Sequence, residues 1–199
     1  LSWKHAVYEL EKRNIKFNKN IQLRNMPSHL IIGGISSGKS LFAETLAKGI
    51  YDDNANAGLY YIATAPILDD EMINKIETHK KRRSKQWITI EEQIDIFEKI
   101  RLIPEKNQII LIECITTWLS NMLFHESNLS SNIQILIDFI KSSEENHVIL
   151  VSNDLGDSVI SENKEVRFFQ QLNGQINQQI AEVSDNVHKV IAGINIKIK

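Results

Sequence analysis

Residues 33–40 constrain the fold of this chain more than any other stretch. They read Gly-Gly-Ile-Ser-Ser-Gly-Lys-Ser and fit G-x-x-x-x-G-K-[ST], the Walker A phosphate loop. The apolar run 30–32 precedes the motif and indicates a buried strand, and good helix formers follow it over 41–50. A strand, a glycine-rich loop and a helix in this order are the setting in which the motif binds a nucleotide.

The chemistry of such a loop assigns a role to each part of it. Glycine lets the backbone turn tightly, so that successive N–H groups point at phosphate oxygens, and the helix N-terminus adds partial positive charge. We expect Lys39 to reach the β- and γ-phosphates as a catalytic group, and the Ser40 hydroxyl to ligate Mg²⁺. The predicted phosphate-binding residues are Gly33, Gly34, Ile35, Ser36, Ser37, Gly38, Lys39 and Ser40.

Length and composition favour one α/β domain. The chain has 199 residues, of which 42% are hydrophobic and 24% charged, as in an ordinary globular protein. No apolar run approaches the length of a membrane span. Cys114 is the only cysteine, which excludes intramolecular disulfides and multi-cysteine metal sites and fits a reducing cytosol, so we expect a cytoplasmic protein.

Charge divides the chain into two parts. Residues 1–29 hold six Lys and Arg against two Glu, whereas residues 30–199 carry a net charge of −6. A body this acidic is a poor binder of duplex nucleic acid. We expect residues 1–29 to form a basic arm or helix that packs on the body or on a neighbouring subunit, and residues 30–199 to form the nucleotide-binding domain.

The rest of the chain alternates between apolar runs and amphipathic segments. Strands are expected at 59–63, 87–90, 109–113, 148–151 and 187–191, with an edge strand at 195–199. Helices are expected at 71–83, 91–101, 116–124, 129–141 and 165–184. Strands regularly separated by helices predict an α/β fold with a mostly parallel sheet flanked by helices.

Ligands in such a sheet bind beyond the carboxyl ends of the strands, which brings the loops 33–40, 63–68, 113–117 and 152–156 together. Glu113 ends the apolar run 109–113 in the Walker B pattern, where a carboxylate can hold Mg²⁺ directly or through water. The alternative is an acid that merely ends a strand.

His79 is a candidate nucleophile. It lies one helical turn after Ile76 and directly before the basic run 80–83. A neutral imidazole can attack phosphorus, and Lys and Arg can neutralise the charge that builds on phosphate oxygens. The alternatives are a structural or exposed histidine and a basic run that is a solvated helix end. The other five histidines lie in no comparable setting.

From about residue 30 to 199 the chain resembles the bifunctional adenosylcobinamide kinase/adenosylcobinamide-phosphate guanylyltransferases of cobalamin biosynthesis. The resemblance is carried by GGISSGKS (33–40), YIATAPILDDEM (61–72), His79-Lys80-x-Arg82-Arg83, Trp87-x-Thr89-x-Glu91, IILIECITTWLSNMLF (109–124), VSNDLG (151–156) and the pattern formed by Ser161, Arg167, Gly174, Asn177 and Ala181. Residues 1–29 lie outside it.

The resemblance implies a RecA-like P-loop fold and two reactions at one nucleotide site. One phosphorylates the aminopropanol hydroxyl of adenosylcobinamide, and the other transfers GMP from GTP to that phosphate through a GMP-histidine intermediate, for which His79 is the matching position. It implies that Ala63, Thr64, Ala65, Lys80, Lys81, Arg82, Arg83, Glu91 and Glu113 line the GTP site. Mg²⁺ and GTP are the implied cofactors, with ATP an alternative donor for the kinase step, and a homotrimer is the implied assembly.

The sequence departs from the family pattern at a few positions. Ile35, Ser36, Leu41 and Phe42 stand in and after the phosphate loop where the family often has Ala-Arg and Arg-His, and Asp154 and Gln171 stand for Glu and Asp. Fewer basic groups near the phosphates argue against an efficient kinase step. Two other hypotheses stay open: a GTP-binding homologue with a regulatory role, and a P-loop kinase of another small hydroxyl substrate in which His79 is structural.

Overall fold

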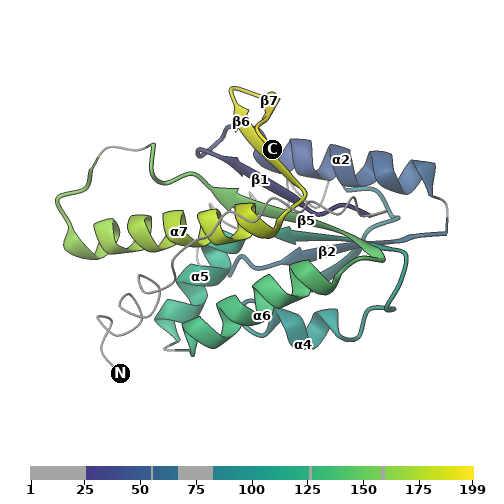
Figure 1. The fold of residues 1–199 in the computed structure, drawn as a ribbon, viewed down its shortest axis with the longest axis horizontal. Helices are drawn as coiled ribbons and strands as arrows, with labels where there is room; N and C mark the ends of the chain where they lie inside the picture. Colours follow the sequence, from purple (N-terminus) through teal and green to yellow (C-terminus); the bar gives the residue numbers. More distant parts are fainter. Residues whose placement is uncertain (1–25, 55, 67–82, 126, 158–159) are drawn as a thin grey trace.

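A single β-sheet forms the centre of the protein in a computed structural model (Figure 1). The structure describes residues 26–54, 56–66, 83–125, 127–157 and 160–199. Seven strands lie in the order β3-β2-β4-β5-β1-β6-β7. The strands are β1 (His29–Gly33), β2 (Gly58–Ala63), β3 (Ile88–Glu91), β4 (Gln108–Glu113), β5 (Asn146–Asn153), β6 (Asn186–Ile191) and β7 (Ile194–Lys197). All neighbours are parallel except β6 and β7, which confirms the predicted mostly parallel α/β fold with a C-terminal edge strand.

The helices form a layer on each face of the sheet. They are α2 (Lys39–Asp53), α4 (Ile96–Ile100), α5 (Ile115–Phe124), α6 (Leu129–Ser142) and α7 (Lys164–Val183). Figure 1 shows α2 on one side of the sheet and α4, α5, α6 and α7 on the other. Within the described residues no helix is long and apolar enough to cross a membrane.

Two hydrophobic cores follow from this layering. Ala43 and Ala47 of α2 pack with Ile31 and Leu111 on one face of the sheet. On the other face Trp118 of α5, which is 0% exposed, lies in a larger core with residues of α4, α6 and α7. The central strands are covered on both faces, and this explains why β1, β4 and β5 are continuous apolar runs rather than alternating ones.

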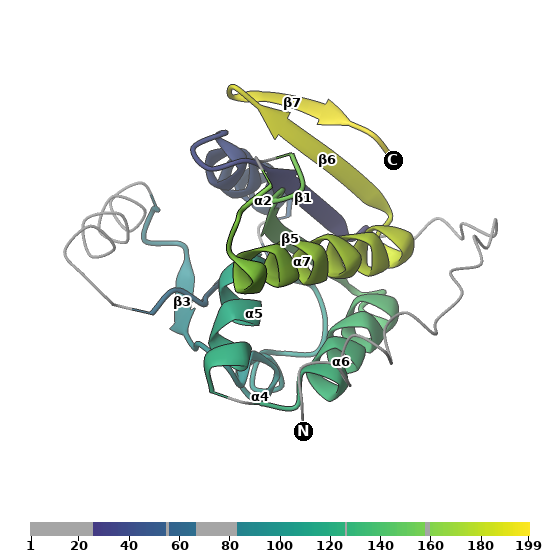
Figure 2. The same cartoon turned by 90° about the vertical axis from the view of Figure 1, so that its left-hand side faces the viewer.

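The C-terminal hairpin closes one edge of the sheet, and Figure 2 shows β7 as its outermost strand. Ala192 (φ 51°) and Gly193 (φ 78°) make the two-residue turn between β6 and β7, and positive φ at both positions is what a tight hairpin turn requires. The Lys199 ammonium donates to the carbonyls of Ala181, Glu182 and Ser184 at the end of α7. The hairpin is therefore anchored to the body at its far end.

Two predicted elements are wrong in their bounds. Residues 91–101 are expected as one helix, but Glu91 is the last residue of β3, where it pairs with Ala63, and α4 covers only 96–100. The Glu92 carboxylate accepts from the backbone N–H groups of Ile94 and Asp95, so a turn replaces the first part of that helix. β5 also continues through Asn153, into a stretch expected as loop.

The remaining predicted bounds agree with the structure to within two residues, except that α2, expected over 41–50, continues to Asp53. The predicted helix over 71–83 and the N-terminal arm lie outside the described residues, apart from Arg83 and 26–29. The division into an arm and a domain at residue 29 stays a prediction.

Candidate functional site

The phosphate loop joins the end of β1 to the start of α2. Gly38, with φ 93°, is the N-cap residue of α2, and Lys39 is the first residue of the helix. Ser37 N–H donates to the Gly34 carbonyl over 3.2 Å, and the same carbonyl accepts from Lys39 Nζ over 3.0 Å. The Lys39 ammonium therefore lies inside the loop, which is where a phosphate chain would meet it.

The turn of the C-terminal hairpin supports the loop from behind. Gly193 N–H donates to the Ser37 carbonyl over 2.8 Å. A Cβ at residue 38 would lie 3.2 Å from Gly193 Cα, and one at residue 33 would lie 2.6 Å from the Val190 carbonyl oxygen. Glycine is thus required at Gly38 by both φ and packing, and at Gly33 by the close approach of β6.

The two predicted metal ligands are brought together. Ser40 Oγ donates to a carboxylate oxygen of Glu113, which ends β4 on the face of the sheet that α2 covers. A hydroxyl and a carboxylate are oxygen donors of the kind that Mg²⁺ takes, with phosphate oxygens and water as its further ligands. Among the residues that the structure describes, no group of three His, Cys, Asp or Glu side chains could hold a metal ion.

The loop after β2 is tied to the loop after β4. Thr64 Oγ1 donates to the Cys114 carbonyl over 2.9 Å and accepts from Cys114 N–H over 2.7 Å. Asn121 Nδ2 donates to the Thr64 carbonyl over 2.8 Å. Thr64 is 0% exposed, so its side chain holds the two loops together, while Ala63 and Ala65 are half-buried beside it.

Arg83 is the described end of the basic run. Its guanidinium carbon lies 3.8 Å from the centre of the Tyr61 ring, and its Nη1 donates to Thr89 Oγ1 over 3.3 Å. Burial raises the pKa of Tyr61, the nearby Glu113 carboxylate raises it further, and Arg83 opposes them. Arg83 and Glu113 therefore both lie close enough to the Tyr61 ring of β2 to influence its pKa. Glu91, in contrast, lies exposed at the end of β3.

The candidate nucleophile His79 and the neighbouring Lys80, Lys81 and Arg82 lie outside the described residues. Their predicted roles stay predictions.

A buried polar network at the end of β5 was not predicted. Thr116 Oγ1 contacts Ser152 Oγ at 3.1 Å, donates to Asn173 Oδ1 over 2.9 Å and accepts from Asn153 N–H over 2.8 Å. Asn173 Nδ2 and Asn177 Nδ2 both donate to the Asn153 carbonyl. These residues come from α5, β5 and α7, and no single stretch of sequence marks them as a group.

A second residue that sequence reasoning missed is Glu44. It lies one turn after Ser40 on α2, is 7% exposed, and raises the pKa of Tyr61. A buried acid on an otherwise small-residue face, with Ala43 and Ala47 beside it, was the available signal.

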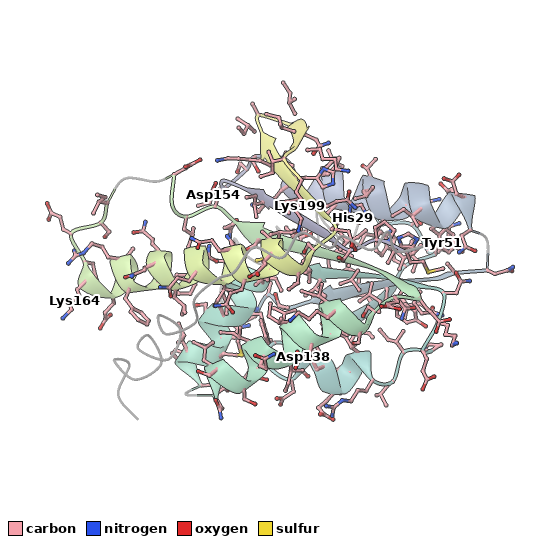
Figure 3. All side chains as sticks on the ribbon, viewed as in Figure 1. His29, Tyr51, Asp138, Asp154, Lys164 and Lys199 are labelled. Carbon is pink, nitrogen blue, oxygen red and sulfur yellow. The ribbon has the colours of Figure 1, made fainter. Side chains whose placement is uncertain are left out.

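Figure 3 labels Asp154, one residue beyond β5, and Tyr51, near the end of α2, and the two lie at opposite ends of the sheet. Asp154 N–H donates to the Gly33 carbonyl over 3.0 Å, and its carboxylate pairs with Lys189 of β6 at 2.9 Å. The end of β5 is thus hydrogen-bonded to the start of the phosphate loop and ion-paired with β6 of the hairpin.

Comparison with known proteins places this architecture in a family. The profile of the cobinamide kinase/cobinamide phosphate guanyltransferase family matches residues 29–198. The bifunctional adenosylcobalamin biosynthesis protein CobU of Escherichia coli (strain K12) is 34% identical over 185 residues, which cover 85% of this chain and 98% of that protein. The CobU protein of Salmonella typhimurium is 36% identical over 187 residues, with the same coverage of 85% and 98%.

A solved structure agrees with the fold. The flagellar accessory protein FlaH from Methanocaldococcus jannaschii superposes with a TM-score of 0.54 at 16% identity, over 87% of this chain and 80% of that one. The fold is that of the P-loop, RecA-like ATPases, as the Walker A motif and the sheet order also indicate. The chain belongs to the cobinamide kinase/cobinamide phosphate guanyltransferase family.

Proposed function

We propose that this protein phosphorylates adenosylcobinamide and then transfers GMP from GTP to adenosylcobinamide phosphate, giving adenosylcobinamide-GDP and pyrophosphate. The observation that carries the proposal is the assembled phosphate loop, with Lys39 inside it and Ser40 bonded to Glu113, in a chain of this family. The enzyme is then a kinase and a nucleotidyltransferase.

The nucleotide lies with its β- and γ-phosphates in the loop 33–40. The loop's N–H groups and Lys39 Nζ bind the phosphate oxygens, and the partial positive charge at the start of α2 adds to this. Ser40 and Glu113 would hold Mg²⁺, which would supply positive charge beside the phosphates. GTP is the nucleotide for both reactions, and ATP is an alternative donor for the first.

The kinase step needs positioning rather than a nucleophilic side chain. The substrate hydroxyl oxygen attacks the γ-phosphorus and loses its proton to water, the bond from the γ-phosphorus to the β–γ bridging oxygen breaks, and the nucleoside diphosphate leaves. Lys39 stabilises the charge on the transferring group, and this use of one preorganised cation is typically worth several kcal/mol of barrier height.

Guanylyl transfer breaks the α–β linkage instead. An imidazole nitrogen of His79 attacks the α-phosphorus, a P–N bond forms, and pyrophosphate leaves. A phosphate oxygen of adenosylcobinamide phosphate then attacks the same phosphorus, and the P–N bond breaks. Arg83, four residues after His79 in the sequence, lies over the Tyr61 ring near Glu113, and this proximity supports a role for His79 at the nucleotide.

The deciding experiment uses GTP labelled with ³²P at the α-phosphate. We expect label to remain on the denatured wild-type protein and to be lost in His79→Ala, which keeps kinase activity but loses guanylyl transfer. His125→Ala, at an exposed histidine after α5, is the matched control and should label like wild type. Intact guanylyl transfer in His79→Ala would contradict the covalent route, and kinase activity on a different hydroxyl substrate alone would contradict the proposed function.

The protein is expected to act in the cytosol as a homotrimer, without nucleic-acid partners. The hairpin supports self-association, because Ile191, Ile194, Ile196 and Ile198 are each between 47% and 67% exposed there. Exposed apolar patches of this kind are typical of subunit contacts.

A further inference from the structure

The long helix α7 is rich in polar side chains that carry no charge. Seven of its 20 residues are Asn or Gln, and all seven lie within 170–179. Residues 168–181 contain no charged side chain, so the charged residues of the helix are confined to its two ends. The polar face of a surface helix is typically charged. A neutral face of amides is instead suited to a neutral ligand that both donates and accepts hydrogen bonds.

A half-buried glycine lies in the middle of this face. Gln170, Asn177 and Gln178 are three or four positions from Gly174 and so surround it on the helix surface; these four residues are called the α7 amide face. A Cβ at residue 174 would meet no atom within 4 Å. Glycine inside a helix lowers stability by about 0.5–1 kcal/mol relative to alanine, and no close contact within the described residues requires it there. The space beside Gly174 is thus open to a ligand.

Asn177 has an acceptor to offer to such a ligand. Its Nδ2 donates to the Asn153 carbonyl over 3.1 Å, whereas its Oδ1 is buried and has no hydrogen-bond partner within the described ranges. A buried acceptor without a partner costs about 1–3 kcal/mol. A donor group bound beside Gly174 would lie within one helical turn of this oxygen.

The α7 amide face adjoins the nucleotide site. Gln170 Nε2 donates to the Leu155 carbonyl over 3.5 Å, and one residue earlier Asp154 N–H donates to the Gly33 carbonyl at the start of the phosphate loop. Figure 3 shows Lys164, the first residue of α7, on the same side of the molecule as Asp154. The first half of α7 therefore flanks the carboxyl ends of the strands, where ligands bind in such a sheet.

The substrate of the proposed reactions has the matching chemistry. Adenosylcobinamide carries neutral carboxamides around its corrin ring, and its aminopropanol hydroxyl must reach the γ-phosphate, so the ring must lie close to the phosphate loop. A carboxamide can pair with an Asn or Gln side chain through one donated and one accepted hydrogen bond. We propose that the α7 amide face binds peripheral carboxamides of the corrinoid substrate, and that Asn177 Oδ1 accepts a hydrogen bond from one of them. This assignment rests on the proposed function, since it needs a corrinoid substrate.

The test measures the affinity for adenosylcobinamide by equilibrium dialysis, with the corrin absorbance as the readout, and the affinity for GDP with Mg²⁺ by calorimetry. Gly174→Leu places a side chain in the open space and favours the helix. We expect it to weaken corrinoid binding by about tenfold or more, while GDP affinity changes by less than about twofold. Gln178→Ala, at an exposed position, removes one hydrogen-bonding group and should weaken corrinoid binding by about three- to tenfold.

Gly49→Leu is the matched control. Gly49 is also a helical glycine, in α2, and a Cβ there would likewise meet no atom within 4 Å, so this variant should bind both ligands like wild type. Wild-type corrinoid affinity in Gly174→Leu would overturn the assignment, as would an equal loss of GDP affinity. A changed molecular mass in light scattering, with corrinoid affinity unchanged, would assign the face to a subunit contact instead.

The wild-type protein separates the two proposals. If it phosphorylates adenosylcobinamide and Gly174→Leu keeps full corrinoid affinity, the proposed function stands and the assignment of the α7 amide face fails. If the wild type neither binds nor phosphorylates the corrinoid, both fail.

Discussion

The phosphate loop and the end of β5 lie side by side, but they are held by different kinds of contact. The loop is supported through its backbone, by the Gly193 N–H on the Ser37 carbonyl and by the close approach of the hairpin to Gly38. The end of β5 is held by side chains of α5 and α7, chiefly Thr116 and Asn173. One side of the site is therefore encoded in local backbone geometry and the other in long-range polar packing.

This difference determines how substitutions affect each side of the site. A backbone contact survives most substitutions of the partner side chain, provided that φ and the close approach are preserved. A network of buried hydroxyl and amide groups fails when one member is removed, because the other members are left buried without partners. Substitutions in the phosphate loop should therefore lower activity with little effect on stability, whereas substitutions in the network at the end of β5 should lower the free energy of unfolding.

The largest effect is expected on the loop side. Lys39→Ala should reduce both the kinase and the guanylyltransferase activities by at least about a hundredfold, because it removes a preorganised cation from the phosphates. Unfolding by urea should change little. Lys48→Ala, further along α2 in an exposed pair with Asp52, is the control and should keep both activities. GTP affinity and turnover like those of wild type in Lys39→Ala would mean that the nucleotide binds elsewhere.

The same comparison explains how much of the site could be predicted from sequence. The loop 33–40 and its strand and helix are a contiguous signal, and Glu113 follows a run of four apolar residues, so the proximity of Ser40 and Glu113 could be predicted from the sequence. The sequence placed Asn153 only in one of four loops that converge at the carboxyl ends of the strands. The hydrogen bonds that fix its backbone come from Thr116 and Asn173, which lie 37 and 20 residues away in the sequence and become its neighbours only when α5 and α7 pack on the sheet.

Tertiary pairing also overrode a local pattern in the fold. Residues 91–101 carry helical periodicity, yet Glu91 extends β3 because β2 offers it a strand partner at Ala63. Glu92 N–H then donates to the Ala63 carbonyl over 3.0 Å, and this bond fixes where the chain leaves the sheet. Such a boundary depends on the neighbouring strand, which a single stretch of sequence does not specify.

The next largest effect is expected on the β5 side. Thr116→Val keeps the shape of the side chain but removes the hydroxyl, so Asn153 N–H and Asn173 Oδ1 lose a buried partner. We expect the free energy of unfolding to fall by about 2 kcal/mol. Thr45→Val, at an exposed threonine of α2 whose hydroxyl bonds the Leu41 carbonyl, should change it by less than about 0.5 kcal/mol. Equal stabilities in urea titrations would show that the network does not hold the end of β5.

The two sides also differ in their titratable groups. The network of Thr116, Ser152 and Asn173 contains none. On the hairpin side, His29 of β1 and His188 of β6 are both buried, with ring centres 5.6 Å apart and 3.4 Å between His29 Nδ1 and His188 Nε2. His188 Nδ1 contacts Asn195 Oδ1 of β7 at 3.0 Å, and its ring meets Phe42 of α2. This pair joins the hairpin to the strand and helix that flank the loop.

Acid should therefore lower the free energy of unfolding through the His29–His188 pair beside the hairpin, and this is the smallest of the expected effects. Burial, together with the neighbouring His188, lowers the pKa of His29 from 6.5 to about 4. Between these two values the unfolded chain takes up a proton that the folded protein does not, so the free energy of unfolding is highest above pH 6.5 and falls as the pH drops toward 4. His29 accounts for about 1 kcal/mol of the loss between pH 7 and pH 5.5.

The test follows the free energy of unfolding in urea at a series of pH values. In His29→Gln its fall between pH 7 and pH 5.5 should be smaller by about 1 kcal/mol, whatever the stability of the variant at pH 7. His125→Gln, at an exposed site, should give a curve parallel to that of wild type. If the curve of His29→Gln is also parallel to wild type, the hairpin side is no more sensitive to acid than the uncharged network around Asn153.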